Sequence, residues 1–217
     1  AYDDDNRVIV AETSKDGFLY EQDAKYFFYD HGPLARTEVG NEKVQSSDYA
    51  YTIQGWLKTV NGENLSETTM MGEDGLRYSI HENNARDAFG FSLSYFDDDY
   101  DAATTSMLDY SGASSQMGSE LFNGNIRTMM TSLMDIDETA LKAHHTKYSY
   151  DQLNRIKSMT GYYQESGNLD VLSGFASTYD FDENGNLEFL TRKAYQRSSA
   201  ASILMDDFTY HYDETTN

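Results

Sequence analysis

Acidic residues are the first groups in this sequence whose type and spacing could do chemistry, because carboxylate oxygens are the preferred ligands of calcium. Aspartates stand in runs of three at positions 3–5 and 97–99, and the segment Asp182–Glu188 is spaced like the start of an EF-hand loop. Its glycine, Gly185, is the fourth residue of that loop, whereas an EF-hand needs glycine at the sixth position. We therefore interpret these segments as solvated turns of an acidic surface and expect no metal or other cofactor.

The histidine, cysteine and serine residues also show no pattern of a metal site or of a catalytic nucleophile. The five histidines are His31, His81, His144, His145 and His211. His144 and His145 are adjacent, so on a strand they would face opposite ways and could not bind one metal together. There is no cysteine, which excludes thiolate nucleophiles and disulfides, and there is no Gly-x-Ser-x-Gly nucleophile elbow. We therefore predict that the protein is not an enzyme; its many carboxylates leave glycoside hydrolysis open.

Charge and composition narrow the class of protein further. The 217 residues include 16 Lys and Arg against 37 Asp and Glu, a formal net charge of −21, which disfavours nucleic acid and anionic lipid as partners. Mean hydropathy is −0.69, and no run approaches the roughly 18 apolar residues of a membrane span, so we expect no membrane insertion. Aromatic residues form 14% of the chain and proline occurs once. These proportions predict a folded protein with more than a third of its residues in strands and little helix.

An internal repeat organises the expected strands. An aromatic residue, any residue, a second aromatic residue and then aspartate recur at 148–151, 179–182 and 210–213, with weaker copies at 27–30 and 49–52. Alternating aromatics would place two rings on one face of a strand, and the aspartate carboxylate could accept hydrogen bonds from turn amides. Each copy therefore predicts a strand, a tight turn and a return strand.

The repeat gives a structural role to two sets of residues. The aromatic anchors are Tyr2, Tyr29, Tyr51, Tyr150, Phe181 and Tyr212. The aspartates expected to set the turns are Asp3, Asp30, Asp151, Asp182 and Asp213, with Thr52 in place of aspartate after Tyr51. Recurring aromatic pairs are typical of cross-strand ladders. We favour that interpretation over a carbohydrate site on Trp56 and paired tyrosines, because a binding site has no need to recur in every unit.

The repeat resembles the RHS or YD repeat, whose consensus is roughly Tyr-x-Tyr-Asp-x-x-Gly-Arg-Leu. The likeness covers residues 1–61 and 145–217, with degenerate copies at 87–96 and 121–126. The block at 48–58 is similar to the version in bacteria that use type IX secretion. In such proteins a ribbon of β-hairpins winds into a hollow shell, related to those of insecticidal toxin complexes and teneurins, that commonly encloses a toxic C-terminal domain of the same chain. The consensus Gly-Arg-Leu appears here only as Asn-Arg-Ile, Asn-Arg-Val or Gly-Asn-Leu.

We accordingly expect an all-β fold in which repeated β-hairpins form a continuous antiparallel ribbon, an arc of a larger YD-repeat shell. Residues 1–217 would form a single segment, with units near 1–24, 25–47, 48–86, 87–120, 121–146, 147–176, 177–207 and 208–217. The resemblance implies a non-catalytic wall of a secreted or cell-surface protein, which encloses or displays a C-terminal, toxin-like domain. The alternative is an adhesin that binds carbohydrate or protein through its aromatic-rich surface. The implied partners are the remaining repeats and C-terminal domain of the same longer chain, with the secretion machinery as a further partner.

Overall fold

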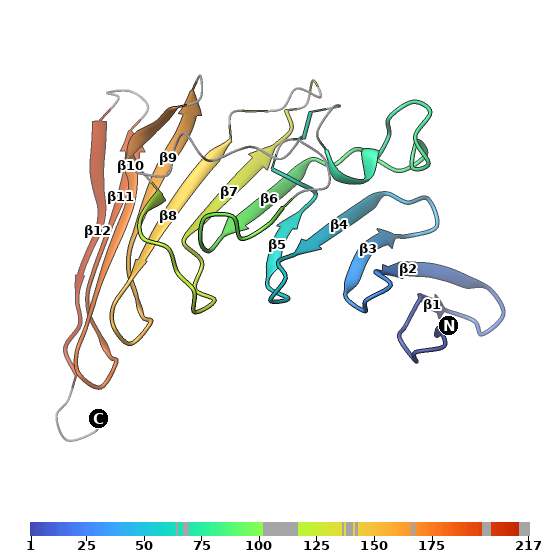
Figure 1. The fold of residues 1–217 in the computed structure, drawn as a ribbon, viewed down its shortest axis with the longest axis horizontal. Helices are drawn as coiled ribbons and strands as arrows, with labels where there is room; N and C mark the ends of the chain where they lie inside the picture. Colours follow the sequence, from blue (N-terminus) through green and yellow to red (C-terminus); the bar gives the residue numbers. More distant parts are fainter. Residues whose placement is uncertain are drawn as a thin grey trace. The chain divides into compact units, whose positions relative to one another are not determined.

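A computed structural model describes residues 1–63, 65–66, 70–101, 117–135, 137, 141, 143–165, 168–196 and 201–212. The fold is all-β, as the sequence predicted, and more than a third of the residues lie in strands that are hydrogen-bonded in chain order (Figure 1). The strands are β1 (Val10–Ser14), β2 (Tyr20–Phe28), β3 (Leu34–Val39), β4 (Gln45–Tyr51), β5 (Leu57–Val60), β6 (Phe89–Ser94), β7 (Thr128–Leu133), β8 (His144–Tyr150), β9 (Ile156–Glu165), β10 (Asn168–Phe181), β11 (Leu187–Gln196) and β12 (Ala201–Thr209). None of the helices in the described part of the chain has the length and hydropathy that crossing a membrane requires.

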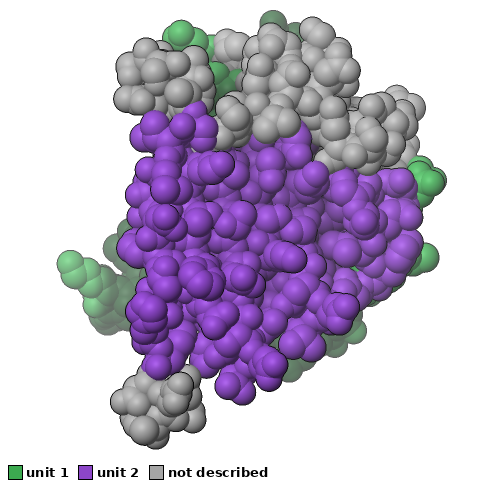
Figure 2. Space-filling model, turned by 90° about the vertical axis from the view of Figure 1, so that its left-hand side faces the viewer, with its two compact units in different colours: residues 1–93, 98–108, 131–141 green, residues 94–97, 109–130, 142–217 purple. Residues whose placement is uncertain are grey.

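The chain divides into two compact units, which Figure 2 shows in different colours. Unit 1 comprises residues 1–93, 98–108 and 131–141, and unit 2 comprises residues 94–97, 109–130 and 142–217. Strands β1 to β5 therefore belong to unit 1, and β8 to β12 belong to unit 2.

In unit 1, one face of strands β3 and β4 is buried and carries polar side chains. Side chains alternate between the two faces of a strand, and the side chains that β3 and β4 bury include Arg36, Glu38 and Asp48. The connection from β5 to β6 contains a short 3₁₀ helix, η1 (Met71–Glu73). From this connection Asn84 Nδ2 donates a hydrogen bond to Glu38 Oε1 at 2.9 Å. The connection thus supplies partners to charged groups of the strands, which need them because buried charge must be paired.

Unit 2 consists of longer hairpins. The pairing of β8 with β9 extends from His144 opposite Tyr163 to Tyr150 opposite Ile156. The register shifts between Ser149 and Tyr150, just before the turn, and the β10–β11 hairpin has the same irregularity just before its own turn. A β-bulge bends the strand and re-aims the side chain that follows it, so the anchor aromatic residues enter their turns from a bent strand.

Candidate functional site

Three of the aspartates that the repeat singles out, Asp3, Asp151 and Asp182, bond within hairpin turns, and Asp3 shows the pattern. Tyr2 forms an antiparallel bridge with Val8 across its turn. Asp3 Oδ1 accepts hydrogen bonds from the backbone amides of Asp5 (3.0 Å) and Arg7 (2.8 Å). The other oxygen, Oδ2, accepts one from Arg7 Nε at 2.7 Å. The carboxylate therefore uses both oxygens to hold its own turn, as the Asx-turn interpretation predicted.

The turn after Tyr150 repeats this arrangement. Asp151 Oδ1 accepts hydrogen bonds from the amides of Leu153 (2.8 Å) and Arg155 (2.9 Å), and Oδ2 accepts one from Arg155 Nε (2.6 Å). Tyr150 lies opposite Ile156, the sixth residue after it. The two turns belong to different units of the protein, so the geometry follows from the local sequence.

The arginine of each turn also contacts the corresponding turn of the next repeat, which follows after one intervening hairpin turn. The Arg7 guanidinium lies 4.6 Å from the centre of the Phe28 ring, and that of Arg155 lies 5.0 Å from the Phe181 ring. Nη1 of each arginine donates a hydrogen bond to a backbone carbonyl of the same neighbouring turn, at 3.3 Å and 2.8 Å. Stacking of a cation on an aromatic face adds attraction beyond packing alone. Each of these turns is therefore held by its own aspartate–arginine bonds and also contacts the corresponding turn of the next repeat.

Two further turns keep the backbone geometry with different side chains. After Phe181, the arginine position holds Asn186, whose backbone amide and Nδ2 donate to the two oxygens of Asp182, each at 2.8 Å. After Tyr51, Thr52 Oγ1 accepts the amide of Trp56 at 3.2 Å. A hydroxyl has one oxygen where a carboxylate has two, so Thr52 reproduces the amide bond without the bridge to a side chain at the arginine position.

In the turn between β2 and β3, the structure shifts the predicted anchor by one residue. Phe28 lies opposite Leu34, and the amide of Tyr29 donates to the carbonyl of Pro33 at 2.9 Å, which is the backbone bond that aspartate makes in the other turns. The anchor is therefore Phe28, and Tyr29, not Asp30, stands in the aspartate position. Strand pairing decides this, because a slip of one residue would turn every side chain of β2 to the opposite face.

Two anchor tyrosines donate their hydroxyls to preceding segments of unit 2. Tyr150 Oη donates to the carbonyl of Ile126 at 2.9 Å, and Tyr212 Oη donates to that of Leu187 at 2.8 Å. Asp213, expected to set the turn after Tyr212, lies outside the described residues. These bonds tie an anchor ring to the backbone of an earlier hairpin.

The turn carboxylates are held in their charged form. Hydrogen bonds from the backbone of the turn arginine are the main cause that lowers the pKa of Asp3 and of Asp151. At Asp182 the main cause of the lowered pKa is the side-chain hydrogen bond from Asn186. Each carboxylate charge is thus stabilised by hydrogen bonds within its own hairpin.

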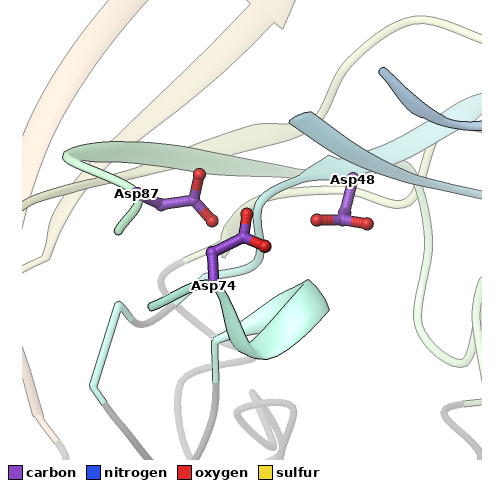
Figure 3. Close-up of side chains that lie close together, drawn as sticks. All are labelled: Asp48, Asp74 and Asp87. Carbon is purple, nitrogen blue, oxygen red and sulfur yellow. The ribbon is translucent and has the colours of Figure 1, made fainter. Parts of the chain in front are cut away.

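A second group of aspartates, which the sequence pattern did not reveal, meets inside unit 1. Asp48 lies on β4, Asp74 follows η1, and Asp87 precedes β6. Figure 3 shows their carboxylates turned toward one another, and one ligand oxygen from each lies within 4.8 Å of the others. We call these three residues the aspartate cluster. Arg36 reaches it from β3, where it stands directly opposite Asp48.

One guanidinium serves two of the three carboxylates. Arg36 Nη1 donates to Asp48 Oδ2, and Nη2 donates to Asp74 Oδ1. Asp74 is completely buried and Asp87 is 4% exposed. Asp74 Oδ2 and Asp87 Oδ2 are both buried and accept no hydrogen bond from any described residue. Three carboxylates against one guanidinium leave two negative charges, which a buried site cannot carry cheaply.

The pKa values reflect this excess of negative charge. Burial, followed by the charges of Asp74 and Asp48, raises the pKa of Asp87 to about 8. Burial also raises the pKa of Asp48, and it outweighs the attraction of Arg36. The cluster can relieve its charge in two ways: it can hold a proton on Asp87, or it can bind a cation.

The neighbouring carboxylate, Glu38, has partners of its own. Arg36 Nε lies 3.3 Å from Glu38 Oε1, Asn84 Nδ2 lies 2.9 Å from the same oxygen, and Lys43 Nζ lies 3.5 Å from Oε2. His81 Nδ1 is 3.7 Å from Oε1. Burial by itself would raise the pKa of Glu38, but these hydrogen bonds and the charge of Lys43 lower it. Glu38 therefore adds no unpaired charge to the aspartate cluster.

The acidic runs found in the sequence do not form such a cluster. Asp97 pairs with Arg127 within unit 2, and Asp99 pairs with Lys58 within unit 1, each at 2.7 Å. In the part of the chain that the structure describes, the aspartate cluster is the one place where three potential ligand groups converge.

The histidines pack individually. The His31 ring stacks on that of Tyr29 with centres 5.2 Å apart. The His144 and Phe175 rings are nearly perpendicular, with centres 6.0 Å apart, and burial lowers the pKa of His144. Within the described ranges, no histidine joins two other potential ligands.

No protein-family model matches the sequence, and no curated protein matches it. Among solved structures, the crystal structure of TcdB2-TccC3 matches 96% of this chain at 8% identity with a TM-score of 0.35. The crystal structure of TcdB2-TccC3-TEV matches 98% at 10% identity with a TM-score of 0.22. The matched parts are 10% and 11% of those chains, so this chain spans about a tenth of their length. Similarity at this level carries no argument about function.

Proposed function

We propose that residues 1–217 are a non-catalytic wall segment of a secreted or cell-surface RHS/YD-repeat protein. In this proposal further repeats of the same longer chain complete a shell around a C-terminal domain. The observation that carries it is the recurrence of one turn geometry at Asp3 and Asp151, down to the arginine that stacks on the next anchor. A repeat that binds its own successor extends structure in one direction, as in other repeat proteins.

The exposed edge of β12 supports the proposal. This strand pairs with β11 along its length, and the described strands supply no partner for its other edge. Its consecutive apolar side chains Ile203, Leu204 and Met205 are 41%, 56% and 55% exposed. A long apolar strand edge is a template for pairing with another strand. We propose that the next repeat of the longer chain covers it.

One loop favours the alternative function, adhesion. In the β1–β2 turn, Phe18 is 88% exposed and Leu19 is 75% exposed. Asp16 Oδ1 accepts their backbone amides at 2.8 Å and 2.9 Å, which holds the loop in an ordered conformation. An ordered apolar tip next to the exposed Tyr20 could stack on a sugar or dock on a protein.

The test uses the natural gene product that contains these residues. Electron microscopy and limited proteolysis should find a closed hollow particle whose C-terminal domain is protected from protease. Leu204→Lys on the β12 edge should open the shell and expose that domain, whereas Leu153→Lys, at an exposed turn position, should not. An open ribbon that binds glycans, and loses that binding on Phe18→Ala, would support adhesion and contradict the shell. Turnover of a substrate by residues of this segment would contradict both.

A further inference from the structure

The aspartate cluster of unit 1 has the ligand chemistry of a calcium site. Its three carboxylates each offer an oxygen, and these oxygens lie within 4.8 Å of one another. Calcium binds oxygens at about 2.3–2.6 Å, so two ligands of one ion can be up to about 5 Å apart. We propose that Asp48, Asp74 and Asp87 bind one divalent cation of the calcium class. This site is separate from the repeat turns on which the proposed function rests.

Two buried oxygens point to a missing partner in the cluster. Asp74 Oδ2 and Asp87 Oδ2 are shielded from solvent and accept no hydrogen bond within the described residues. In Figure 3 the carboxylates that carry them face the space between the three side chains. A buried carboxylate oxygen without a partner costs free energy, and a cation in that space would contact both oxygens at once.

The charges of the cluster match a divalent ion. Arg36 neutralises one of the three negative charges through its bonds to Asp48 and Asp74, which leaves a charge of two to be balanced. Arg36 uses Oδ2 of Asp48 and Oδ1 of Asp74, so the other oxygen of each stays available. A monovalent ion would leave one buried negative charge without compensation.

Calcium suits the cluster better than magnesium for a geometric reason. The three ligands come from a strand, the residue after a 3₁₀ helix and a segment that precedes another strand. Calcium accepts irregular coordination of this kind, whereas magnesium demands a nearly ideal octahedron with oxygens at about 2.0–2.1 Å. A bound ion would also fasten both ends of the segment from Asp74 to Asp87 to strand β4, so this segment should become more rigid when the ion binds.

The test titrates the metal-free protein with CaCl₂ and follows binding by calorimetry and by terbium luminescence. Wild type should show one saturable site and a higher melting temperature with calcium. Asp74→Asn and Asp87→Asn should each weaken binding at least about tenfold, because each removes one charged ligand. The matched control is Asp4→Asn, which removes the same charge from an exposed residue and should bind calcium like wild type.

Hydrogen exchange of the wild-type protein tests the proposal even if a variant fails to fold. In wild type, calcium should slow amide exchange between Asp74 and Asp87 and leave β11 and β12 unchanged, and magnesium at the same concentration should do less. The proposal is overturned if wild type shows no saturable site at millimolar calcium. It is also overturned if Asp87→Asn binds calcium as tightly as Asp4→Asn, or if calcium does not change exchange in this segment.

Discussion

The hairpin turns and the interior of unit 1 use the same residue, aspartate, in opposite ways. In the turns, hydrogen bonds from backbone amides lower the pKa of Asp3 and of Asp151. In the interior, burial and neighbouring carboxylates raise the pKa of Asp87 to about 8. The side chain is the same, so the direction of the shift depends on whether its oxygens meet donors or other oxygens.

The two environments also differ in the sequence distance over which they are built. Asp151 obtains its donors from residues two and four positions later. Asp48, Asp74 and Asp87 come from separate segments, and Arg36, from a fourth segment, bonds to Asp48 and Asp74. A turn that is complete within a few residues can recur along a chain, whereas a cluster assembled from distant segments forms only when the whole unit folds.

The largest loss of stability is expected when the guanidinium that pairs with the aspartate cluster, that of Arg36, is removed. Arg36→Met would leave Asp48 and Asp74 buried without their guanidinium, so the free energy of unfolding should fall by about 3–5 kcal/mol. Arg192→Met is the control, because Arg192 pairs with Asp206 at the surface with its side chain 47% exposed and should cost less than about 1 kcal/mol. Urea denaturation measures both, and equal losses would contradict the distinction between interior and surface.

The pH dependence of stability should run in opposite directions in the two environments. The folded pKa of Asp87 is raised from 3.8 to about 8. The stability that its protonated form contributes is therefore fully present below pH 3.8 and is lost as the pH rises through about 8. The lowered pKa of Asp151 has the opposite sign: its contribution is present above pH 3.8 and is lost as the pH falls through the folded pKa. The free energies of unfolding of wild type and Asp87→Asn should be measured in EDTA from about pH 5 to 9. The free energy of unfolding of the variant should rise relative to that of wild type as the pH rises. A constant difference between the two would contradict the raised pKa of Asp87.

Glycine substitutions separate close packing from turn conformation. A Cβ at Gly90 would lie 2.6 Å from the carbonyl oxygen of Gly62, and backbone cannot move aside easily, so Gly90→Ala should cost about 3 kcal/mol. Gly185 has a φ of +91°, and a Cβ there would make only an ordinary contact, 3.9 Å from Arg155 Nη1, so Gly185→Ala should cost only about 1 kcal/mol, for the left-handed backbone. Gly185→Asn should be nearly neutral, because Asn154 occupies the same turn position with a φ of +62°. Thermal melts can rank the three, and a Gly185→Ala loss as large as that of Gly90→Ala would contradict the ranking.

The smallest loss of stability is expected at Asp30, and it tests the corrected position of the anchor in the turn between β2 and β3. Asp151→Ala removes the oxygen that accepts two backbone amides and the oxygen that pairs with Arg155, so it should cost about 1–2 kcal/mol. Asp30→Ala should change the free energy of unfolding by less than about 0.5 kcal/mol, because Tyr29 stands in the aspartate position of that turn. Equal losses in urea would restore Asp30 as the residue that sets the turn.

The sequence predicted the turns well where the motif was complete. At Tyr150-Asp151 and Phe181-Asp182 it placed the anchor, the turn and the return strand correctly. It misplaced the anchor at Tyr29, because three consecutive aromatic residues, Phe27 to Tyr29, match the motif in more than one register. Strand pairing resolves that ambiguity, and pairing is a contact between segments.

The all-β class, the order of the hairpins and the Asx turns follow from local sequence, because their hydrogen bonds link residues close together in the chain. The aspartate cluster does not, since Asp48, Asp74 and Asp87 carry no shared motif or spacing. A weak signal exists in the alternation of Arg36, Glu38 and Asp48 on neighbouring strands, but charged residues at alternate positions usually mark a solvated face. These side chains face inward because residues from the β5–β6 connection pair with them there. That arrangement depends on how distant segments meet, and the folded chain alone sets it.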